Sequence, residues 1–109
     1  TAAEILISNL RIMQENNVLH NAISTQNYTW ALELLDFELS SSPKHPYERE
    51  DYQRHVPTLM PREIMYTYQI IVEIADCLGE DIDFQRIDLI FLEYGFDLNK
   101  YNIKTTSRL

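Results

Sequence analysis

Residues 64–78 constrain the fold of this chain more than any other stretch, because apolar side chains would cover most of the surface of a helix formed there. Only a narrow polar line interrupts them, made by Gln69, Glu73 and Asp76 at successive spacings of four and three residues. A helix with so much apolar surface has to be covered on most of its sides. We therefore expect this helix either at the centre of a helical bundle or as half of an interface between subunits.

Two helices are predicted in the part of the chain that precedes residue 40. The first spans residues 2–17, because Thr1 and Glu4 form a capping box ahead of apolar residues at helical spacing. The second begins near residue 28 and is capped by Thr25 or Asn27. Its core-facing stripe consists of Tyr28, Ala31, Leu32, Leu35 and Leu39.

Two further helices are predicted in the C-terminal half. The third has Pro61 in its first turn and Thr58 as its cap, and it runs to about residue 78. The fourth spans residues 84–94 and is capped by Asp81 or Asp83. Because their connection is short, we expect these two helices to form an antiparallel hairpin.

The only two glycines of the chain, Gly79 and Gly95, each follow an apolar helical run. Glycine adopts the left-handed backbone conformation at little cost, and that conformation commonly ends a helix. Both glycines are therefore predicted to end helices, and Phe96 is placed to pack back over the turn at Gly95.

The predicted fold class is all-α: a small bundle of four main helices with a C-terminal helical hairpin. We expect a single helical domain over residues 1–109, of which the last five residues or so are frayed. Residues 40–60 connect the second and third helices, and Pro43, Pro46 and Pro57 stiffen that connection. Charged residues within it are spaced as in a short helix. We therefore predict an ordered crossover that presents side chains.

The charge of the chain restricts its partners. Acidic residues outnumber basic ones by 17 to 9, and the formal net charge is −8. Residues 63–97 alone carry nine acids and a single base, Arg86. Since duplexes are bound by clustered Lys and Arg, we expect no nucleic-acid partner. No apolar run approaches the ~20 residues that span a bilayer, so we expect no membrane partner either.

The single cysteine, Cys77, favours a reducing compartment, which we expect to be the cytoplasm, because no internal disulfide can form. Its apolar setting predicts a buried and inert thiol. The chain begins with Thr1 rather than Met, so we expect a processed chain or a piece of a longer protein, and no signal-peptide pattern is visible.

No motif identifies a reaction. A phosphate-binding loop is excluded because both glycines are expected to end helices. His20 is expected to be a capping or surface residue. His45, Asp51 and His55 could hold zinc or iron, but basic residues nearby oppose a cation. We predict no catalytic residue, no metal and no cofactor, and we expect the protein not to be an enzyme.

Aromatic residues give the best candidates for contact with a partner, since the chain has seven tyrosines and one tryptophan. Tyr28, Tyr68 and Tyr94 fall on core-facing stripes and are expected to rim the core with their hydroxyls in water. The remaining aromatic residues and nearby acids supply the predicted partner-binding set: Trp30, Tyr47, Glu48, Asp51, Tyr52, Tyr66, Glu73, Asp76, Glu80 and Asp81.

The resulting hypothesis is a non-enzymatic protein-binding module with a basic protein partner. Its most specific form is a small acidic inhibitor, of the immunity, antitoxin or phage type, of a protein that acts on nucleic acid. One alternative is a homodimeric scaffold or regulatory subunit that pairs through the apolar helix. A second alternative is a metal-dependent enzyme that uses His45, Asp51 and His55.

Overall fold

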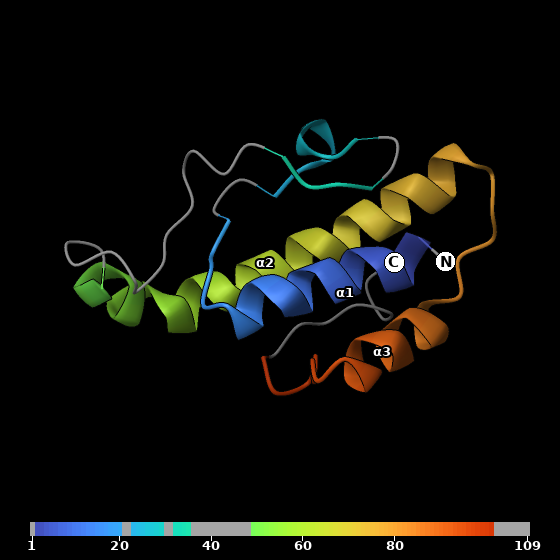
Figure 1. The fold of residues 1–109 in the computed structure, drawn as a ribbon. Coiled ribbons are helices and arrows are strands. Elements are labelled where there is room, and N and C mark those ends of the chain that lie inside the picture. The colour runs from blue at the N-terminus through green and yellow to red at the C-terminus, as the bar shows by residue number, and fades with distance from the viewer. Residues whose placement is uncertain (1, 21–22, 30–31, 36–48, 102–109) are drawn as a thin grey trace.

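The computed structural model describes residues 2–20, 23–29, 32–35 and 49–101, and for residues 49–53, 55, 56 and 58 it describes the backbone alone. These residues form a small, mostly helical fold with three α-helices: α1 (Ala2–Glu15), α2 (Arg49–Cys77) and α3 (Phe84–Glu93). A short 3-10 helix, η1 (Thr25–Asn27), lies between α1 and α2 in the sequence. Figure 1 shows α1 alongside α2, with α3 on the side of α1 away from η1.

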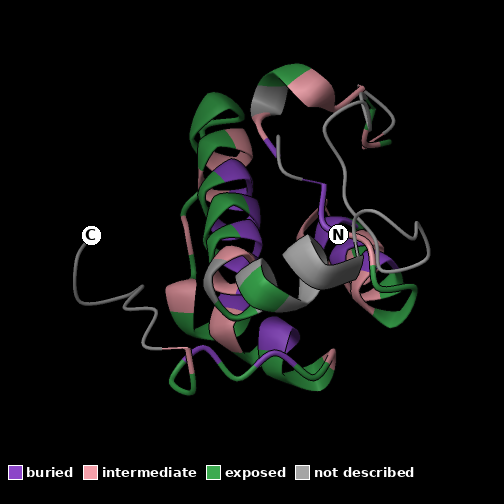
Figure 2. Ribbon diagram, turned by 90° about the vertical axis from the view of Figure 1, so that its left-hand side faces the viewer, coloured by how far each residue is buried: buried purple, intermediate pink, exposed green. Residues whose placement is uncertain are grey.

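The core forms where α1 meets the other two helices, since α1 packs against both α2 and α3. Figure 2 shows buried residues along one side of a helix and exposed residues along the other. On α1 the buried side repeats at the spacing of helical turns, as the sequence predicts. It carries Leu6, Ile7, Leu10 and Met13.

Aromatic rings fill the space between α3 and its neighbours. Phe91 is fully buried, and its ring stacks on that of Tyr68 of α2 with the centroids 5.6 Å apart. Phe96 meets the Phe91 ring edge-on at 6.1 Å. The Tyr68 hydroxyl donates a hydrogen bond of 3.0 Å to Asp88 Oδ1. Phe96 therefore packs back over the end of α3, as predicted.

All three helices end in the same way, with a left-handed residue just beyond the last turn. Asn17, Gly79 and Gly95 have φ of 58°, 68° and 87°. In each case the next amide reaches back to a carbonyl five residues earlier, as in the bond of 2.8 Å from Phe96 N to Phe91 O. Both glycines end helices, as predicted, and Asn17 ends α1 in the same way.

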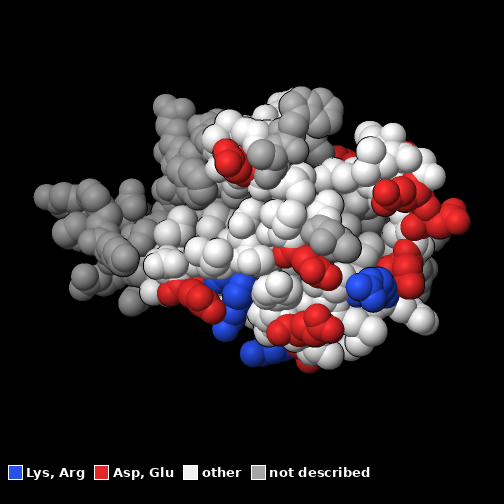
Figure 3. All heavy atoms as spheres, turned by 45° about the vertical axis from the view of Figure 1, so that its right-hand side comes forward, with Lys and Arg blue, Asp and Glu red and all other residues white. Residues whose placement is uncertain are grey.

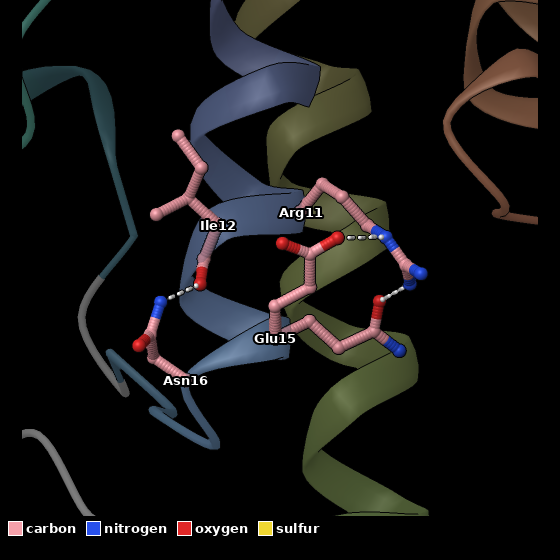
Figure 4. A network of polar contacts seen from close by, with 5 residues as sticks. Arg11, Ile12, Glu15 and Asn16 are labelled. Carbon is pink, nitrogen blue, oxygen red and sulfur yellow. Dashed lines mark hydrogen bonds and ion pairs between the residues drawn. The ribbon is translucent and has the colours of Figure 1, made fainter.

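The end of α1 is further fixed by side chains, which Figure 4 shows. Asn16 Nδ2 donates to the carbonyl of Ile12 at 2.8 Å. Arg11 donates from Nη1 to Gln14 Oε1 at 2.7 Å and pairs through Nε with Glu15 at 3.2 Å. A Cβ added to Gly95 would lie 3.6 Å from the Arg11 guanidinium carbon. This positive group thus lies beside the C-terminal end of α3, where a helix dipole favours it.

The start of α3 is also confirmed. Asp83 is its N-cap, with an extended backbone at φ −98° and ψ 92°. Its carboxylate accepts a hydrogen bond of 3.1 Å from the amide of Arg86. This bond satisfies one of the backbone amides that have no partner within the first turn of a helix.

The predicted second helix is wrong. Residues 28 and 34 instead form an isolated antiparallel bridge, in which Thr29 N donates to Glu33 O at 2.9 Å and Leu35 N donates to Asn27 O at 2.7 Å. Leu32 has φ of 61°, which no helix interior accepts. Tyr and Thr prefer extended backbone, and the Thr29 hydroxyl also accepts from Glu33 N at 3.2 Å, in competition with helical bonding.

The predicted start of the third helix is wrong as well, because α2 begins at Arg49 and contains both Pro57 and Pro61. Residues 49–60 of the predicted crossover 40–60 are therefore helix, and residues 36–48 lie outside the described part of the chain. Pro57 is exposed, so solvent can reach the carbonyl four residues earlier that lacks a donor. The segment is therefore helical, as its charge spacing indicates, although it contains two prolines.

The predicted C-terminal hairpin and the bundle of four main helices are wrong too. After Gly79 the chain runs through a non-helical connection, residues 80–83, and α3 then makes its closer contacts with α1 rather than with α2. The buried residues of α3, which include Ile87 and Ile90, need an apolar surface, and α1 provides one. The result is a three-helix arrangement with α1 shared by both partners (Figure 1).

Candidate functional site

The exposed side of α2 is the first candidate site. With about 100° between successive residues, the buried residues in the second half of α2 span an arc of roughly 160°. They are Ile64, Thr67, Tyr68, Ile70 and Ile71. The opposite arc is exposed and carries Met65, Tyr66, Gln69, Glu73 and Asp76. The polar line noted in the sequence is therefore the solvent side of an amphipathic helix.

Further acidic residues follow the end of α2. Glu80 and Asp81 are exposed in the connection to α3, and Figure 3 shows acidic side chains gathered at that end of the molecule. We call Tyr66, Glu73, Asp76, Glu80 and Asp81 the acidic face. Within the described part of the chain, no ion pair joins its carboxylates to a basic side chain. Their charge is thus directed to solvent.

The structure does not bring all of the predicted partner-binding residues together. Asp51 and Tyr52 fall in the first turn of α2, where only the backbone is described. At 1.5 Å per residue, Tyr52 lies about 30 Å along the helix from Glu73. Trp30, Tyr47 and Glu48 lie outside the described residues. Of the predicted set, Tyr66, Glu73 and Asp76 lie on one side of α2.

Within the described part of this single chain, α2 is not covered at its C-terminal end, and its alternative role as half of a subunit interface stays a prediction. Leu78, which follows the last residue of α2, is 66% exposed. Cys77, predicted to be buried, is exposed. It follows Tyr66 by eleven residues, which is three helical turns, so it lies on the same solvent side.

A second candidate lies inside the molecule, where His20 and Glu63 are 0% and 3% exposed. The backbone amide of His20 donates to Glu63 Oε1 at 3.0 Å. His20 Nε2 lies 2.7 Å from the carbonyl oxygen of Leu35. Because a carbonyl only accepts, Nε2 carries a proton and donates it. The expectation of a surface or capping histidine is therefore wrong.

Two hydroxyl groups belong to the same interior region. Thr67 is fully buried one helical turn after Glu63, and the hydroxyl of Tyr28 is buried as well. Burial, together with the negative charge of Glu63, raises the pKa of Tyr28 to about 12. We call His20, Tyr28, Glu63 and Thr67 the polar cluster.

Sequence reasoning missed the polar cluster, although one signal was available. Glu63 lies on the same side of α2 as Met60, Thr67 and Ile70, all of which are buried. A carboxylate on an apolar stripe has to find partners, since burial of an unpaired charge is costly. Its partner, His20, lies 43 positions earlier in the chain, and local spacing does not reveal a contact over that separation.

The described residues offer no site for a metal ion. Over the residues that the structure describes, no group of three or more His, Cys, Asp or Glu side chains is arranged to hold a metal ion. His45 lies outside those residues, and the side chains of Asp51 and His55 are not described. Among the described helices, none is long and apolar enough to cross a membrane.

No family model matches the chain, and no curated protein or solved structure matches it either. Any functional conclusion therefore depends on the chemistry of these two regions.

Proposed function

We propose that the chain is a non-enzymatic protein-binding module that binds a more basic protein through the acidic face. The observation that supports this proposal is the exposed arc of α2 that carries Tyr66, Glu73 and Asp76, followed by exposed acids in the connection to α3. Such a surface offers one aromatic contact and several unpaired carboxylates to the same partner.

The two kinds of residue have different roles in such a contact. Tyr66 has a ring that can be covered by a partner and a hydroxyl that can remain hydrogen-bonded, which is why tyrosine is common at the centre of interfaces. The carboxylates of Glu73, Asp76 and Glu80 speed and orient the approach of a basic surface, an effect that salt reduces.

The most specific form of the proposal is a small acidic inhibitor of a protein that acts on nucleic acid. Such a protein has a basic surface for the phosphate backbone, and an acidic face of this kind would compete for that surface. A homodimer paired through the same face is less well supported, because it would set the carboxylates of one copy against those of the other.

The test is capture of partners by the tagged chain from an extract of its source, followed by light scattering on the purified complex. The proposal expects one basic protein held in a one-to-one complex. The double variant Glu73→Lys, Asp76→Lys should weaken that complex at least tenfold, because it replaces attraction by repulsion. A matched control is Glu33→Lys, Glu93→Lys, which makes the same change in charge at exposed positions away from the acidic face.

Two results would contradict the proposal. One is equal weakening by the variant and its control, which would show that net charge alone matters. The other is a stable homodimer of the 12.9 kDa chain with no companion, which would favour the scaffold alternative.

A further inference from the structure

The polar cluster contains two hydroxyl groups that have no hydrogen-bond partner in the part of the chain that the structure describes. They are Tyr28 OH and Thr67 Oγ1, and both oxygen atoms are buried. Thr67 as a residue has no exposed surface. Polar groups buried in proteins are nearly always paired, so two orphans in one region call for an explanation.

The two hydroxyls come from different parts of the fold, and each is related to Glu63 by a separate observation. Thr67 follows Glu63 by one turn of α2 and faces the same way. Tyr28 belongs to the segment after η1, and the charge of Glu63 contributes to the raised pKa of its hydroxyl. His20, from the same side of the fold as Tyr28, already donates its amide to Glu63 Oε1. Donors and acceptors thus converge from two elements.

The chemistry of these groups restricts what could join them. A hydroxyl donates one hydrogen bond and accepts others, and an ionised carboxylate only accepts. A group that pairs all three must therefore donate and accept in several directions. Water does so, and an internal water typically makes two to four hydrogen bonds to polar groups that would otherwise be unpaired. A larger ligand would have to displace the buried side chains that surround the site, which are close-packed.

We propose that the polar cluster binds one internal water molecule that joins Tyr28, Glu63 and Thr67. The water donates to the Glu63 carboxylate and accepts from the Tyr28 hydroxyl, and its remaining proton or lone pair serves the Thr67 hydroxyl. The site has a structural role, because it fastens the non-helical segment that carries His20 and Tyr28 to α2.

The experiment is a search for this water in the wild-type protein by NMR. A bound internal water gives a direct nuclear Overhauser contact between the water signal and nearby protons, here the Thr67 methyl group and the Tyr28 ring. Protons of the exposed Tyr66 ring serve as the control, because water there exchanges too fast to give the same contact. Absence of the contact at Thr67 and Tyr28 would overturn the proposal.

Two variants then test which groups hold the water. Tyr28→Phe and Thr67→Val each remove one hydroxyl and keep the shape, and each should raise the equilibrium constant for unfolding about tenfold, because a paired hydroxyl is lost and the water loses a partner. The double variant should lose less than the product of the two effects, since both act on one water. Two variants that are as stable as the wild type, or more stable, would mean that the hydroxyls are dry and the proposal is wrong.

Discussion

Residues 64–77 of α2 and residues 28–35 have apolar side chains at similar helical spacings, yet the first segment is α-helical and the described part of the second is not. The first lies against α1 and contributes to a continuous apolar core. The second turns back on itself through the bridge between Tyr28 and Leu34, and Tyr28, Leu32 and Leu34 pack as partly buried side chains against the same core. Apolar residues at helical spacing thus indicate contact with a core, but they do not by themselves make a segment helical.

The two segments should therefore respond to different substitutions. The helical core is held by many small apolar contacts, so its largest losses come from deleting a large buried side chain. The segment around Tyr28 combines apolar contacts with the hydrogen bonds of its turn and bridge, so removal of a polar partner should also cost stability there.

Phe91→Ala is expected to cost about 4 kcal/mol of the free energy of unfolding, because it removes a fully buried ring that contacts both Tyr68 and Phe96. Urea unfolding followed by circular dichroism measures the loss. Leu92→Ala, one residue later on the exposed side of α3, should change stability by about 0.5 kcal/mol or less. Equal losses in the two variants would mean that α3 does not pack through Phe91.

Glu63→Leu keeps the volume of the side chain but removes the acceptor for His20 N, and it should cost about 2 kcal/mol. The NMR signals of His20 and its neighbours should shift more than those of α3, since the lost bond joins His20 to α2. Glu73→Leu is the matched control on the exposed side of the same helix. If Glu63→Leu proves as stable as the wild type, apolar contacts alone hold His20 in place.

Stability should fall as pH rises from 10 to 12, because the pKa of Tyr28 is raised from 10.0 to about 12 in the folded state. Below pH 10 the hydroxyl is protonated in both states and the contribution is complete. Between the two values the unfolded chain loses the proton first, so unfolding becomes easier by about 2 kcal/mol, a figure reduced for the partly exposed ring.

The variant Tyr28→Phe should show a smaller change over this range, whereas Tyr66→Phe, at an exposed tyrosine, should behave as the wild type does. Thermal unfolding at a series of pH values provides the measurement. The prediction fails if both variants retain the wild-type dependence.

Asp83→Ala should have the smallest effect, about 1 kcal/mol, because it removes one hydrogen bond at the start of α3. Asp81→Ala removes an acid of the same connection that is not the cap, and it should have less effect. The comparison, made by urea unfolding, separates the capping bond from a general reduction in negative charge.

Local signals predicted the helix ends well and the long-range contacts poorly. Gly79, Gly95 and Asp83 act on backbone groups within a few residues of themselves, so their roles can be read from the sequence alone. The pairing of His20 with Glu63 depends on how distant elements meet, which spacing does not encode. Tyr28 illustrates the limit: its ring packs against the core as predicted, but its predicted helix and its predicted solvent-exposed hydroxyl are both wrong.

The candidate site could also be predicted only in part. The exposure of Glu73 and Asp76 follows from helical spacing once α2 is recognised, and the sequence located this part of the acidic face. Whether the acidic face binds a partner stays a prediction. The start of α2 could not be located, because Pro57 and Pro61 ordinarily mark the edge of a helix and here lie inside one.

Those two prolines also divide α2 into two parts that we expect to differ in how easily they unwind. Each removes one amide from the ladder of bonds between successive turns, so the carbonyls of Gln53 and Pro57 receive no donor from within the helix. The turns that precede residue 57 are therefore fastened to the rest less tightly than the turns from Ile64 onward, which keep every rung and lie against α1. We therefore expect the turns that precede residue 57 to need less free energy to open than the turns from Ile64 onward.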